Sequence, residues 1–477
     1  MTKRILLVSA YGLFPMLEFE LAIMSEFSST DEVYFSRCIG MQSKCSANTH
    51  KTRILKQLKC YKCKSRVDNG LKAFSNVKKI NIIDRNFKNS SDFNLPPEAR
   101  EIIEFSAHSN AMTHLDSSGK PTDETLNDYL EIAFNSLASY VDLIKKYNIN
   151  TVFIYNGRLA EYAPLVWYCK QKNIDFNTYE YPMYGNNNYT FCERGNVSDI
   201  IFLSDQFKSK IKNETYEINE GGEFFYNRIN RLYNDLSTQF LMNQEKGNLS
   251  YLDKHIHKKN IISIFTSNEI EYSGVQEISI ERFYKTQSEL INEIISKFPK
   301  DYTLIIRVHP NAKYDKFHSQ SIKEICSKHN DVVLFNYESK VDSYELIKKS
   351  SLVICFGSTI GIESMYLKKP TICIGPSIYS KFINNYNNIY TNEKFKNFIE
   401  NIESQILNLS SKELIEQNYI SACQYGYAWK NSGIISNRIS SKAYGKIYFK
   451  AEDKSMSFNS SLVSRILYKF FKGVVND

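Results

Sequence analysis

One segment of the chain combines residue types that could bind a phosphate. The apolar residues 352–356 read as a strand and run directly into Gly357, Ser358 and Thr359. A helix is expected from about Ile360, so unpaired backbone N–H groups and two hydroxyls would meet at one point. This chemistry predicts that Ser358, Thr359 and the adjacent amides bind the phosphate of a nucleotide. A tight turn without a ligand is the alternative interpretation.

Charged residues near this segment extend the predicted site. Glu363 lies one turn into the expected helix, where it would either hold ribose hydroxyls or only complement the helix dipole. Arg307 and His309 end an earlier strand and would neutralise charge on a leaving phosphate, although a histidine before Pro310 also suits a purely structural role. Together these residues predict a nucleotide at the carboxyl edge of a parallel sheet.

Three glutamates are candidates for the general base that an attacking hydroxyl needs. Glu180 ends a predicted strand in the first half of the chain, with Arg158 opposite it. Glu269 and Glu271 follow a strand in the second half. The alternative for Arg158 and Glu180 is a buried ion pair that fixes a loop. The residues alone leave the choice among the three glutamates open.

Four of the ten cysteines lie close together in the sequence, namely Cys38, Cys45, Cys60 and Cys63. Disulfides are disfavoured in a reducing compartment, and a Cys-x-x-Cys pair with two further cysteines permits a tetrahedral zinc site. The distance from Cys38 to Cys45 is wider than in ordinary zinc ribbons. The cluster therefore predicts either a structural zinc or free thiols.

Composition sets the class of protein. The chain has 477 residues, of which 42% are apolar and 23% charged, so two globular domains are expected. A net charge of +8 suits a protein that handles anions or contacts an anionic membrane, and it is too small to indicate nucleic-acid binding. Neither a signal peptide nor a membrane-spanning run is visible, so a cytoplasmic location is expected.

Short apolar strands alternate with amphipathic helices in both halves, which is typical of an α/β protein with parallel sheets. The expected strands are 5–10, 33–35, 151–155 and 174–179 in the first half, and 261–266, 302–308, 332–335, 352–356 and 371–374 in the second. The expected helices include 17–27, 125–147, 281–298, 314–329 and 343–350. We therefore expect an N-terminal domain over 1–235, a connecting helical segment over 236–260, a second domain over 261–435 and a tail over 436–477.

The tail differs from the rest of the chain. Residues 436–458 are polar and are expected to be irregular, whereas apolar residues repeat at helical spacing over 462–475 with basic residues between them. A basic amphipathic helix of this kind can lie on an anionic membrane, which predicts contact through 460–475 with the inner face of the cytoplasmic membrane. A closing helix packed on the first domain is an equal alternative.

In their order and spacing, several segments resemble a bacterial family of capsule and surface-polysaccharide glycosyltransferases with the GT-B fold. The matching segments are the four-cysteine cluster, Asn156–Arg158 with Glu180, Phe265–Glu271, Ile306–Asn311, Phe356–Glu363 and Tyr425–Tyr427, and they span most of residues 1–435. The His-Pro and Ser/Thr motifs are also similar to those of GT-B sialyltransferases and Kdo transferases. The resemblance implies two Rossmann-like parallel-sheet domains facing across a cleft, followed here by the C-terminal amphipathic helix.

The resemblance also implies an activity, which is transfer of a sugar from a nucleotide-activated donor to a growing or lipid-linked glycan such as capsule or O-antigen. The acceptor would bind the first domain and the donor the second. The predicted catalytic set is Arg158, Glu180, Glu269, Glu271 and His309, and the predicted donor-binding set is Ser267, Arg307, His309, Asn311, Gly357, Ser358, Thr359 and Glu363.

No cofactor is expected for catalysis. The chain lacks the Asp-x-Asp signature of metal-dependent transferases, and a helix dipole with basic side chains can stabilise the leaving phosphate instead. A UDP-sugar 2-epimerase shares the architecture and is one alternative, although its turn carries two glutamates where this chain has one. A teichoic-type polyol-phosphate transferase and, last, a non-enzymatic assembly subunit are the others.

Overall fold

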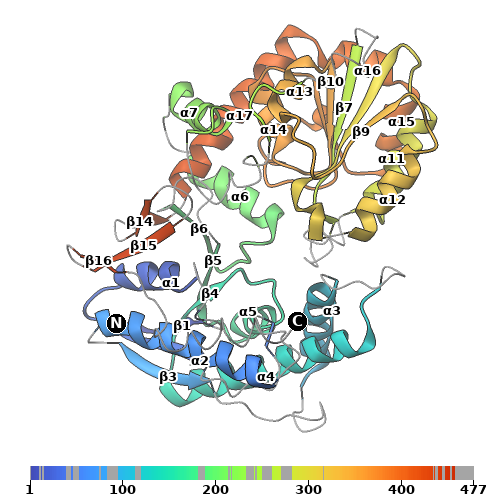
Figure 1. Ribbon diagram of the computed structural model, residues 1–477. Helices are drawn as coiled ribbons and strands as arrows, with labels where there is room; N and C mark the ends of the chain where they lie inside the picture. The colour runs from blue at the N-terminus through green and yellow to red at the C-terminus, as the bar shows by residue number, and fades with distance from the viewer. Residues whose placement is uncertain are drawn as a thin grey trace. The chain divides into compact units, whose positions relative to one another are not determined.

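The computed structural model describes most of the chain (Figure 1). The described residues are 2–9, 12, 16–38, 45–46, 53–74, 77–82, 95–112, 120–180, 188–212, 215, 217–232, 241, 244–249, 260–269, 282–314, 316–432, 434–435, 439–442, 446–451 and 454–456. The chain divides into two compact units. Unit 1 comprises Met1–His114, Pro121–Ser198 and Gly433–Asp477, and unit 2 comprises Leu115–Lys120 and Asp199–Ser432.

Unit 1 is built on a seven-stranded sheet with the order β13-β6-β5-β4-β1-β2-β3. Its strands are β1 (Arg4–Val8), β2 (Glu32–Cys38), β3 (Lys78–Ile82), β4 (Thr151–Tyr155), β5 (Asp175–Glu180), β6 (Asn188–Glu193) and β13 (Ile434–Ile435). The strands β1 to β5 pair in parallel, whereas β6 is antiparallel to both β5 and β13. The predicted parallel sheet is therefore confirmed, with an antiparallel edge that the sequence did not indicate.

Continuous apolar runs explain why the central strands of unit 1 are buried on both faces. β4 is buried along its whole length, and β1 is buried after its first residue. The long helix α4 (Asp123–Tyr147) begins where the Thr122 hydroxyl accepts a hydrogen bond from the Thr125 amide, and it ends at Asn148 in the left-handed conformation. Its apolar side packs with α3 (Pro97–Ala111) in one core.

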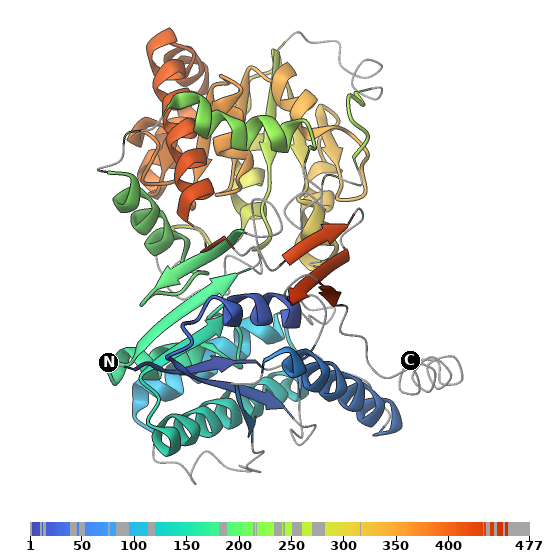
Figure 2. The ribbon, with the colours of Figure 1, turned by 90° about the vertical axis from the view of Figure 1, so that its left-hand side faces the viewer.

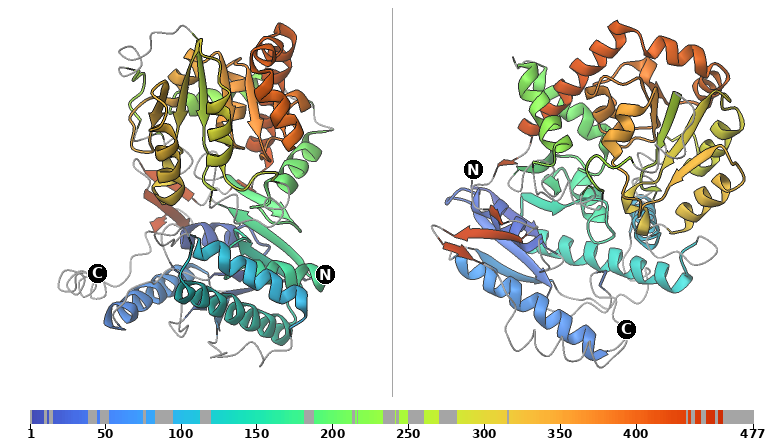
Figure 3. Two further views of the ribbon diagram at one scale, coloured as in Figure 1. Left: turned by 90° about the vertical axis from the view of Figure 1, so that its right-hand side faces the viewer. Right: turned by 45° about the horizontal axis from the view of Figure 1, so that its top comes forward.

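The first helix of unit 1, α1 (Met16–Ser25), is buried along nearly its whole length. It contacts α2 (Arg53–Gly70) on one side and the strands β14 (Ile439–Lys442) and β15 (Lys446–Ala451) on another. Figures 2 and 3 show α1, at the blue end of the chain, beside these red strands. With β16 (Lys454–Met456) they form a three-stranded antiparallel sheet, so part of the tail predicted to be irregular is regular structure.

Unit 2 is built on a six-stranded sheet with the order β12-β11-β10-β7-β8-β9, in which every pair is parallel. Its strands are β7 (Asn260–Phe265), β8 (Tyr302–Arg307), β9 (Val332–Phe335), β10 (Leu352–Cys355), β11 (Thr371–Ile374) and β12 (Asn388–Ile389). The two parallel-sheet units confirm the predicted fold class of two Rossmann-like domains.

Helices cover both faces of the second sheet. The helices α11 (Gln287–Ser296), α12 (Lys316–Cys326), α15 (Asn392–Glu400) and α16 (Ile402–Leu409) share one apolar core with the strands. Figure 1 shows α13 (Ser343–Lys349) and α14 (Ile360–Tyr366) on the opposite side of the sheet from α11 and α12. The helix α11 begins at Gln287, later than the predicted residue 281, because Thr286 caps it.

The division between the units differs from the predicted boundary at residue 235. The helices α6 (Ile200–Ile211) and α7 (Ile218–Ile229) belong to unit 2, because both pack against the long helix α17 (Lys412–Ser432). Within the predicted connecting helix 236–260, the described residues 244–249 form turns, with Gly247 in the left-handed region. The predicted amphipathic helix over 462–475 lies outside the described residues.

Candidate functional site

The predicted strand, turn, helix and second strand of unit 2 are all present. β10 ends at Cys355, Gly357 adopts a positive φ of 66°, and α14 begins at Ile360. Tyr379 stabilises the turn, because its hydroxyl donates a hydrogen bond to the carbonyl of Ser358 over 2.7 Å. Ser358 and Thr359 themselves are half-buried, so this turn is not sealed inside the protein.

A glycine in α14 allows Tyr379 to approach the turn. A Cβ atom at Gly361 would overlap the Tyr379 hydroxyl and would lie 2.6 Å from Sγ of Cys355. Cys355 and Cys373 both contact the same hydroxyl, at 3.4 Å and 3.3 Å. The local sequence gives no sign of this contact, because Tyr379 lies in a loop after β11.

His309 lies at the carboxyl end of β8 with one ring nitrogen already engaged. Its backbone N–H donates to the Thr266 hydroxyl over 2.9 Å, which ties the end of β8 to the end of the neighbouring β7. The backbone N–H of Asn311 donates a hydrogen bond to Nδ1 of His309 over 3.1 Å. Because Nδ1 accepts, Nε2 carries the ring proton and is the donor of the imidazole. An imidazole in this state can donate to an anion.

Arg307 is almost fully buried and serves the protein's own backbone. Its guanidinium donates to the carbonyl of Asn336 and, over 3.0 Å, to the carbonyl of Ser339. Burial lowers the pKa of Arg307 to about 10, so the side chain still carries its charge at neutral pH. These contacts hold the loop after β9 and orient the guanidinium toward that loop.

Glu363 is 1% exposed and pairs with a cation from a distant segment. Its carboxylate lies 2.8 Å from Nε of Arg228, a residue of α7. The predicted ribose contact would need this carboxylate to face a ligand, and here it faces α7. The ion pair gives Glu363 a structural role within unit 2.

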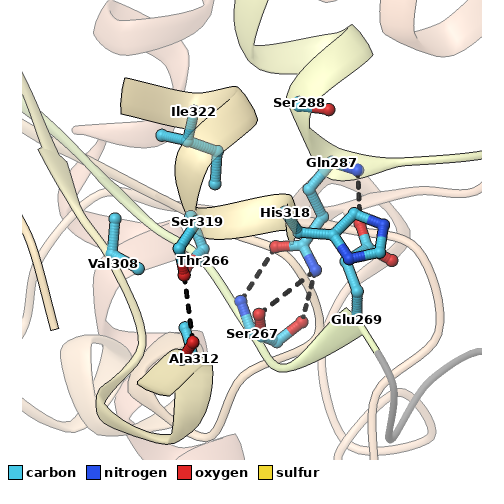
Figure 4. Close-up of a pocket in the computed structure, with 10 residues that line it drawn as sticks. All are labelled: Thr266, Ser267, Glu269, Gln287, Ser288, Val308, Ala312, His318, Ser319 and Ile322. Atoms are coloured by element: carbon cyan, nitrogen blue, oxygen red, sulfur yellow. Dashed lines mark hydrogen bonds between the residues drawn. The ribbon is translucent and has the colours of Figure 1, made fainter. Parts of the chain in front are cut away.

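Glu269 and Ser267 hold the beginning of α11. The Glu269 carboxylate pairs with Arg282 at 2.8 Å and accepts a hydrogen bond from the backbone N–H of Gln287. The Gln287 side chain in turn accepts from the Ser267 amide over 2.9 Å and donates to the Ser267 hydroxyl over 3.0 Å. Figure 4 shows Gln287 between Ser267 and Glu269. Glu271 lies outside the described residues.

A small pocket opens beside these residues at the carboxyl ends of β7 and β8 (Figure 4). Its lining is Thr266, Ser267, Glu269, Gln287, Ser288, Val308, Ala312, His318, Ser319 and Ile322. Because β10, β7 and β8 are adjacent, the Gly357–Thr359 turn, Thr266 and His309 end at one edge of the sheet. The structure therefore brings most of the residues predicted to bind the donor to one edge of the sheet, beside Thr266 and Gln287.

In unit 1, Glu180 ends β5 and accepts hydrogen bonds from two neighbours on β4 and the loop after it. The Tyr155 hydroxyl donates over 2.7 Å, and the Asn156 side-chain amide donates to the second oxygen. Arg158 is half-buried, and its backbone N–H donates to the Asn156 side chain over 3.1 Å. Within the described residues the Glu180 carboxylate is thus bonded to Tyr155 and Asn156 and forms no ion pair with Arg158.

One family model matches part of the chain. Residues 273–425 match the family model described as "Capsule polysaccharide biosynthesis protein". The match confirms the resemblance indicated by the motifs over this part, which is less than half of the chain and lies entirely within unit 2. It contains the His-Pro segment and the Gly357–Thr359 turn. No protein with a curated description matches the sequence.

Several solved structures align with this one. One is a beta Kdo 2,4 transferase, KpsC of Thermosulfurimonas dismutans, which has 9% sequence identity over 57% of this chain and 79% of that chain, with a TM-score of 0.38. A glycosyltransferase of Rickettsia africae has 14% identity over 100% of this chain and 99% of that chain, with a TM-score of 0.34. The UDP-GlcNAc 2-epimerase of Neisseria meningitidis has 12% identity over 90% and 97%, with a TM-score of 0.34. These scores are too low to argue for a shared activity.

The four clustered cysteines lie on β2, on α2 and at residue 45, and all four thiols are half-buried. Burial raises the pKa of Cys63 to about 11, and the Gly12 amide donates to its sulfur over 2.9 Å. Among the described residues, which include all four cysteines, no three metal-ligating side chains are grouped as a metal site. The structural zinc therefore stays a prediction.

No helix in the part of the chain that the structure describes is long and apolar enough to span a bilayer.

Proposed function

We propose that the protein is a glycosyltransferase that moves a sugar from a nucleotide-activated donor to a growing surface polysaccharide. The observation that carries this proposal is the capsule-biosynthesis match, because it contains His309 and the Gly357–Thr359 turn, which lie at the carboxyl edge of the second sheet. Ligands of α/β proteins bind at such edges.

In this proposal unit 2 binds the donor. The hydroxyls of Ser358 and Thr359 and the amides of the turn would bind the donor phosphate, and Nε2–H of His309 would donate to the same group as charge develops on it. Asn311 contributes by fixing Nδ1 of His309 as an acceptor. Arg307 would contribute only a long-range positive charge, because its donors already bond to backbone carbonyls.

The chemistry would proceed without a catalytic metal. Support comes from the sequence, which lacks Asp-x-Asp, and from the hydroxyl, amide and imidazole donors at the sheet edge. Donors fixed in position before the reaction stabilise developing charge without reorganisation.

The test is a donor panel with mass analysis of the products, using the full chain with chelator present. Transfer of a sugar to a glycan acceptor supports the proposal. An epimerised nucleotide sugar or an added polyol phosphate would assign the protein to one of the two alternative classes, and no product with any donor would contradict an enzymatic role.

Two variants connect the activity to the site. We expect His309→Ala and Ser358→Ala each to lower kcat by about 10²-fold or more, which is typical for the loss of one charge-stabilising donor. Far-UV circular dichroism checks that both variants fold. Full turnover in both would remove the donor site from this edge of the sheet.

The acceptor would be a glycan or lipid-linked glycan, and residues 460–475 would contact the inner face of the cytoplasmic membrane. The support is the alternation of apolar and basic residues in that segment. Flotation with anionic liposomes tests it by comparing the full chain with a chain that ends at Asn459. Equal flotation of the two would exclude a membrane role for the segment.

A further inference from the structure

Arg158 of unit 1 is a half-buried cation whose charge has no partner in the part of the chain that the structure describes. Its backbone N–H donates to the Asn156 side chain, and its guanidinium forms no hydrogen bond or ion pair within the described residues. Arginines are seldom buried unless their charge is paired. The guanidinium is therefore available to an anion from outside the chain.

The other buried and half-buried arginines in the described ranges all have internal partners. Arg307 donates to the carbonyls of Asn336 and Ser339. The rest pair with carboxylates, namely Arg37 with Asp68, Arg66 with Glu18, Arg228 with Glu363, Arg231 with Asp342 and Arg282 with Glu269. Because this chain pairs such arginines elsewhere, the unpaired charge of Arg158 indicates a ligand.

The Asn156 side chain joins Arg158 to Glu180 without an ion pair. Its amide donates to one oxygen of Glu180, and its carbonyl oxygen accepts from the backbone N–H of Arg158 over 3.1 Å. The other oxygen of Glu180 accepts from the Tyr155 hydroxyl over 2.7 Å. The Glu180 carboxylate thus has its own donors, and the charge of Arg158 stays available.

The turn that carries Arg158 is held in a conformation that few residues adopt. Asn156 and Gly157 both have a positive φ, of 58° and 75°. A positive φ is uncommon for a residue other than glycine, and such residues cluster at functional sites. The Ser198 hydroxyl donates to the Asn156 carbonyl over 3.0 Å, and the Asn196 side chain donates to the Gly157 carbonyl over 3.2 Å. The backbone of Arg158 is therefore fixed before a ligand binds, which lowers the entropy lost on binding.

Arg158 also follows the strand at which the order of the first sheet reverses. Its turn comes directly after β4, and β4 is the neighbour of β1. From β1 the sheet continues through β2 to β3, whereas from β4 it continues in the opposite direction to β5. Parallel α/β sheets bind their ligands outside the carboxyl ends of the strands at such a reversal. The position of Arg158 therefore supports a ligand site independently of its unpaired charge.

We propose that Arg158 binds an anionic group of the acceptor glycan, which is the carboxylate of an acidic sugar or the phosphate of a lipid link. This inference rests on the proposed glycosyl transfer, in which the acceptor binds unit 1. A guanidinium suits both groups, because its planar N–H donors match two oxygens of a carboxylate or phosphate at once. Arg158, Asn156 and Glu180 all belong to unit 1, so this binding needs no residue of unit 2.

The experiment measures binding of three probes to the full chain by ligand-observed NMR. Trigalacturonate supplies carboxylates, octyl phosphate supplies a lipid phosphate, and maltotriose is a neutral oligosaccharide. We expect Arg158→Met to raise the Kd of the anionic probe by about 10-fold or more, which is typical for the loss of a charge-assisted pair. Arg158→Lys should recover only part of the affinity, because an ammonium lacks the planar pair of donors. Binding of maltotriose should be the same in all variants.

Arg4→Met is the matched control, since it removes the same charge from the same unit at the opposite edge of the sheet. Arg4 begins β1, is exposed and lies 3.8 Å from Glu32. This variant should bind the anionic probes as the wild type does. Urea denaturation adds a second readout: Arg158→Met should keep the free energy of unfolding of the wild type, because its side chain has no partner to lose among the described residues.

The outcomes separate this inference from the proposed function. A selective loss of trigalacturonate binding in Arg158→Met assigns the anion to an acidic sugar, and a selective loss of octyl phosphate binding assigns it to a lipid phosphate. Unchanged binding of both probes, an equal loss in Arg4→Met, or a clear fall in the free energy of unfolding of Arg158→Met overturns the inference and leaves the transferase in place. Loss of anion binding in Arg158→Met, with no sugar transfer by the wild type to any acceptor, would overturn the proposed function and keep only the anion site.

Discussion

Glu363 was predicted to bind the donor ribose, and in the fold it forms a buried ion pair with Arg228. Their buried ion pair predicts that Arg228→Met lowers the free energy of unfolding by about 3–5 kcal/mol, because it leaves a buried carboxylate without its cation. The double variant Arg228→Met with Glu363→Leu should recover part of this loss. Urea denaturation of the two single variants and the double variant measures the coupling.

The variant Glu363→Gln distinguishes between two roles of Glu363, pairing with Arg228 and binding the donor ribose. If Glu363 only pairs with Arg228, Glu363→Gln lowers stability and leaves the donor KM nearly unchanged. A large rise in the donor KM at unchanged stability would instead support the predicted ribose contact, and additive single-variant losses would argue against the ion pair.

Glu20, a buried residue of helix α1, leads to a prediction about the pH dependence of stability that needs no activity assay. Its folded-state pKa is raised, so between about pH 4.5 and that raised pKa the folded protein binds a proton that the unfolded chain has lost. The Glu20 contribution to stability is therefore complete below this window and declines as the pH rises through it. Relative to wild type, Glu20→Gln should gain stability with rising pH, by up to about 1.4 kcal/mol per pH unit. Urea denaturation of both proteins across this range measures the difference.

Two neighbouring charged residues could obscure that trend, because Glu18 and Arg66 also influence Glu20. The pH series should therefore be repeated in the Glu18→Gln background. A difference between wild type and Glu20→Gln that is flat with pH in both backgrounds would contradict a raised pKa.

At the scale of elements, a close crossing of α7 and α17 brings Arg228 toward α14. A Cβ atom at Gly221 would overlap the backbone carbonyl of Cys423, whereas at Gly222 its nearest neighbour would be the Tyr366 ring at 3.5 Å. We expect Gly221→Ala to destabilise the protein by about 1–3 kcal/mol, because the two helices must separate. Thermal or urea unfolding provides the measurement.

Gly222→Ala is the control at the adjacent position of the same helix. Alanine favours a helix over glycine by about 0.5–1 kcal/mol, so this variant should be neutral or slightly stabilised. Similar losses in both variants would mean that the crossing does not depend on the close approach at Gly221.

The elements predicted well are those with long apolar or amphipathic patterns. β4 and α4 agree with their predicted ranges to within two residues at each end, because burial of their apolar side chains determines them locally. The antiparallel pairing of β6 with β13 was not predictable, because its partners are far apart in the sequence. The same reason explains which parts of the site could be predicted. His309 and the Gly357 turn belong to local sequence motifs and were predicted. The contacts of Glu363 with Arg228 and of Tyr379 with Ser358 join segments that are distant in the sequence, so they were not.

At the scale of the whole molecule, unit 2 is nearly continuous in sequence and unit 1 is not. Unit 1 is completed by residues after Ser432, since β13 pairs with β6. A sequence boundary chosen from composition placed α6 and α7 in the first domain. The structure places them in unit 2. There the ring of Phe207 on α6 packs edge-on against the ring of Trp429 on α17, with 5.2 Å between the ring centroids.

This division predicts which fragment of the chain folds alone. A fragment of residues 199–432 keeps α6 and α7, and with them the contact of Phe207 with Trp429 and the partner of Glu363. It should be soluble and unfold cooperatively in urea. A fragment of residues 236–432, cut at the predicted boundary, exposes the apolar side of α17 and leaves the Glu363 carboxylate unpaired, so it should aggregate or unfold without cooperativity. Equal cooperativity in both fragments would mean that α6 and α7 are not part of the folding unit, because the shorter fragment would then contain every contact that its stability requires.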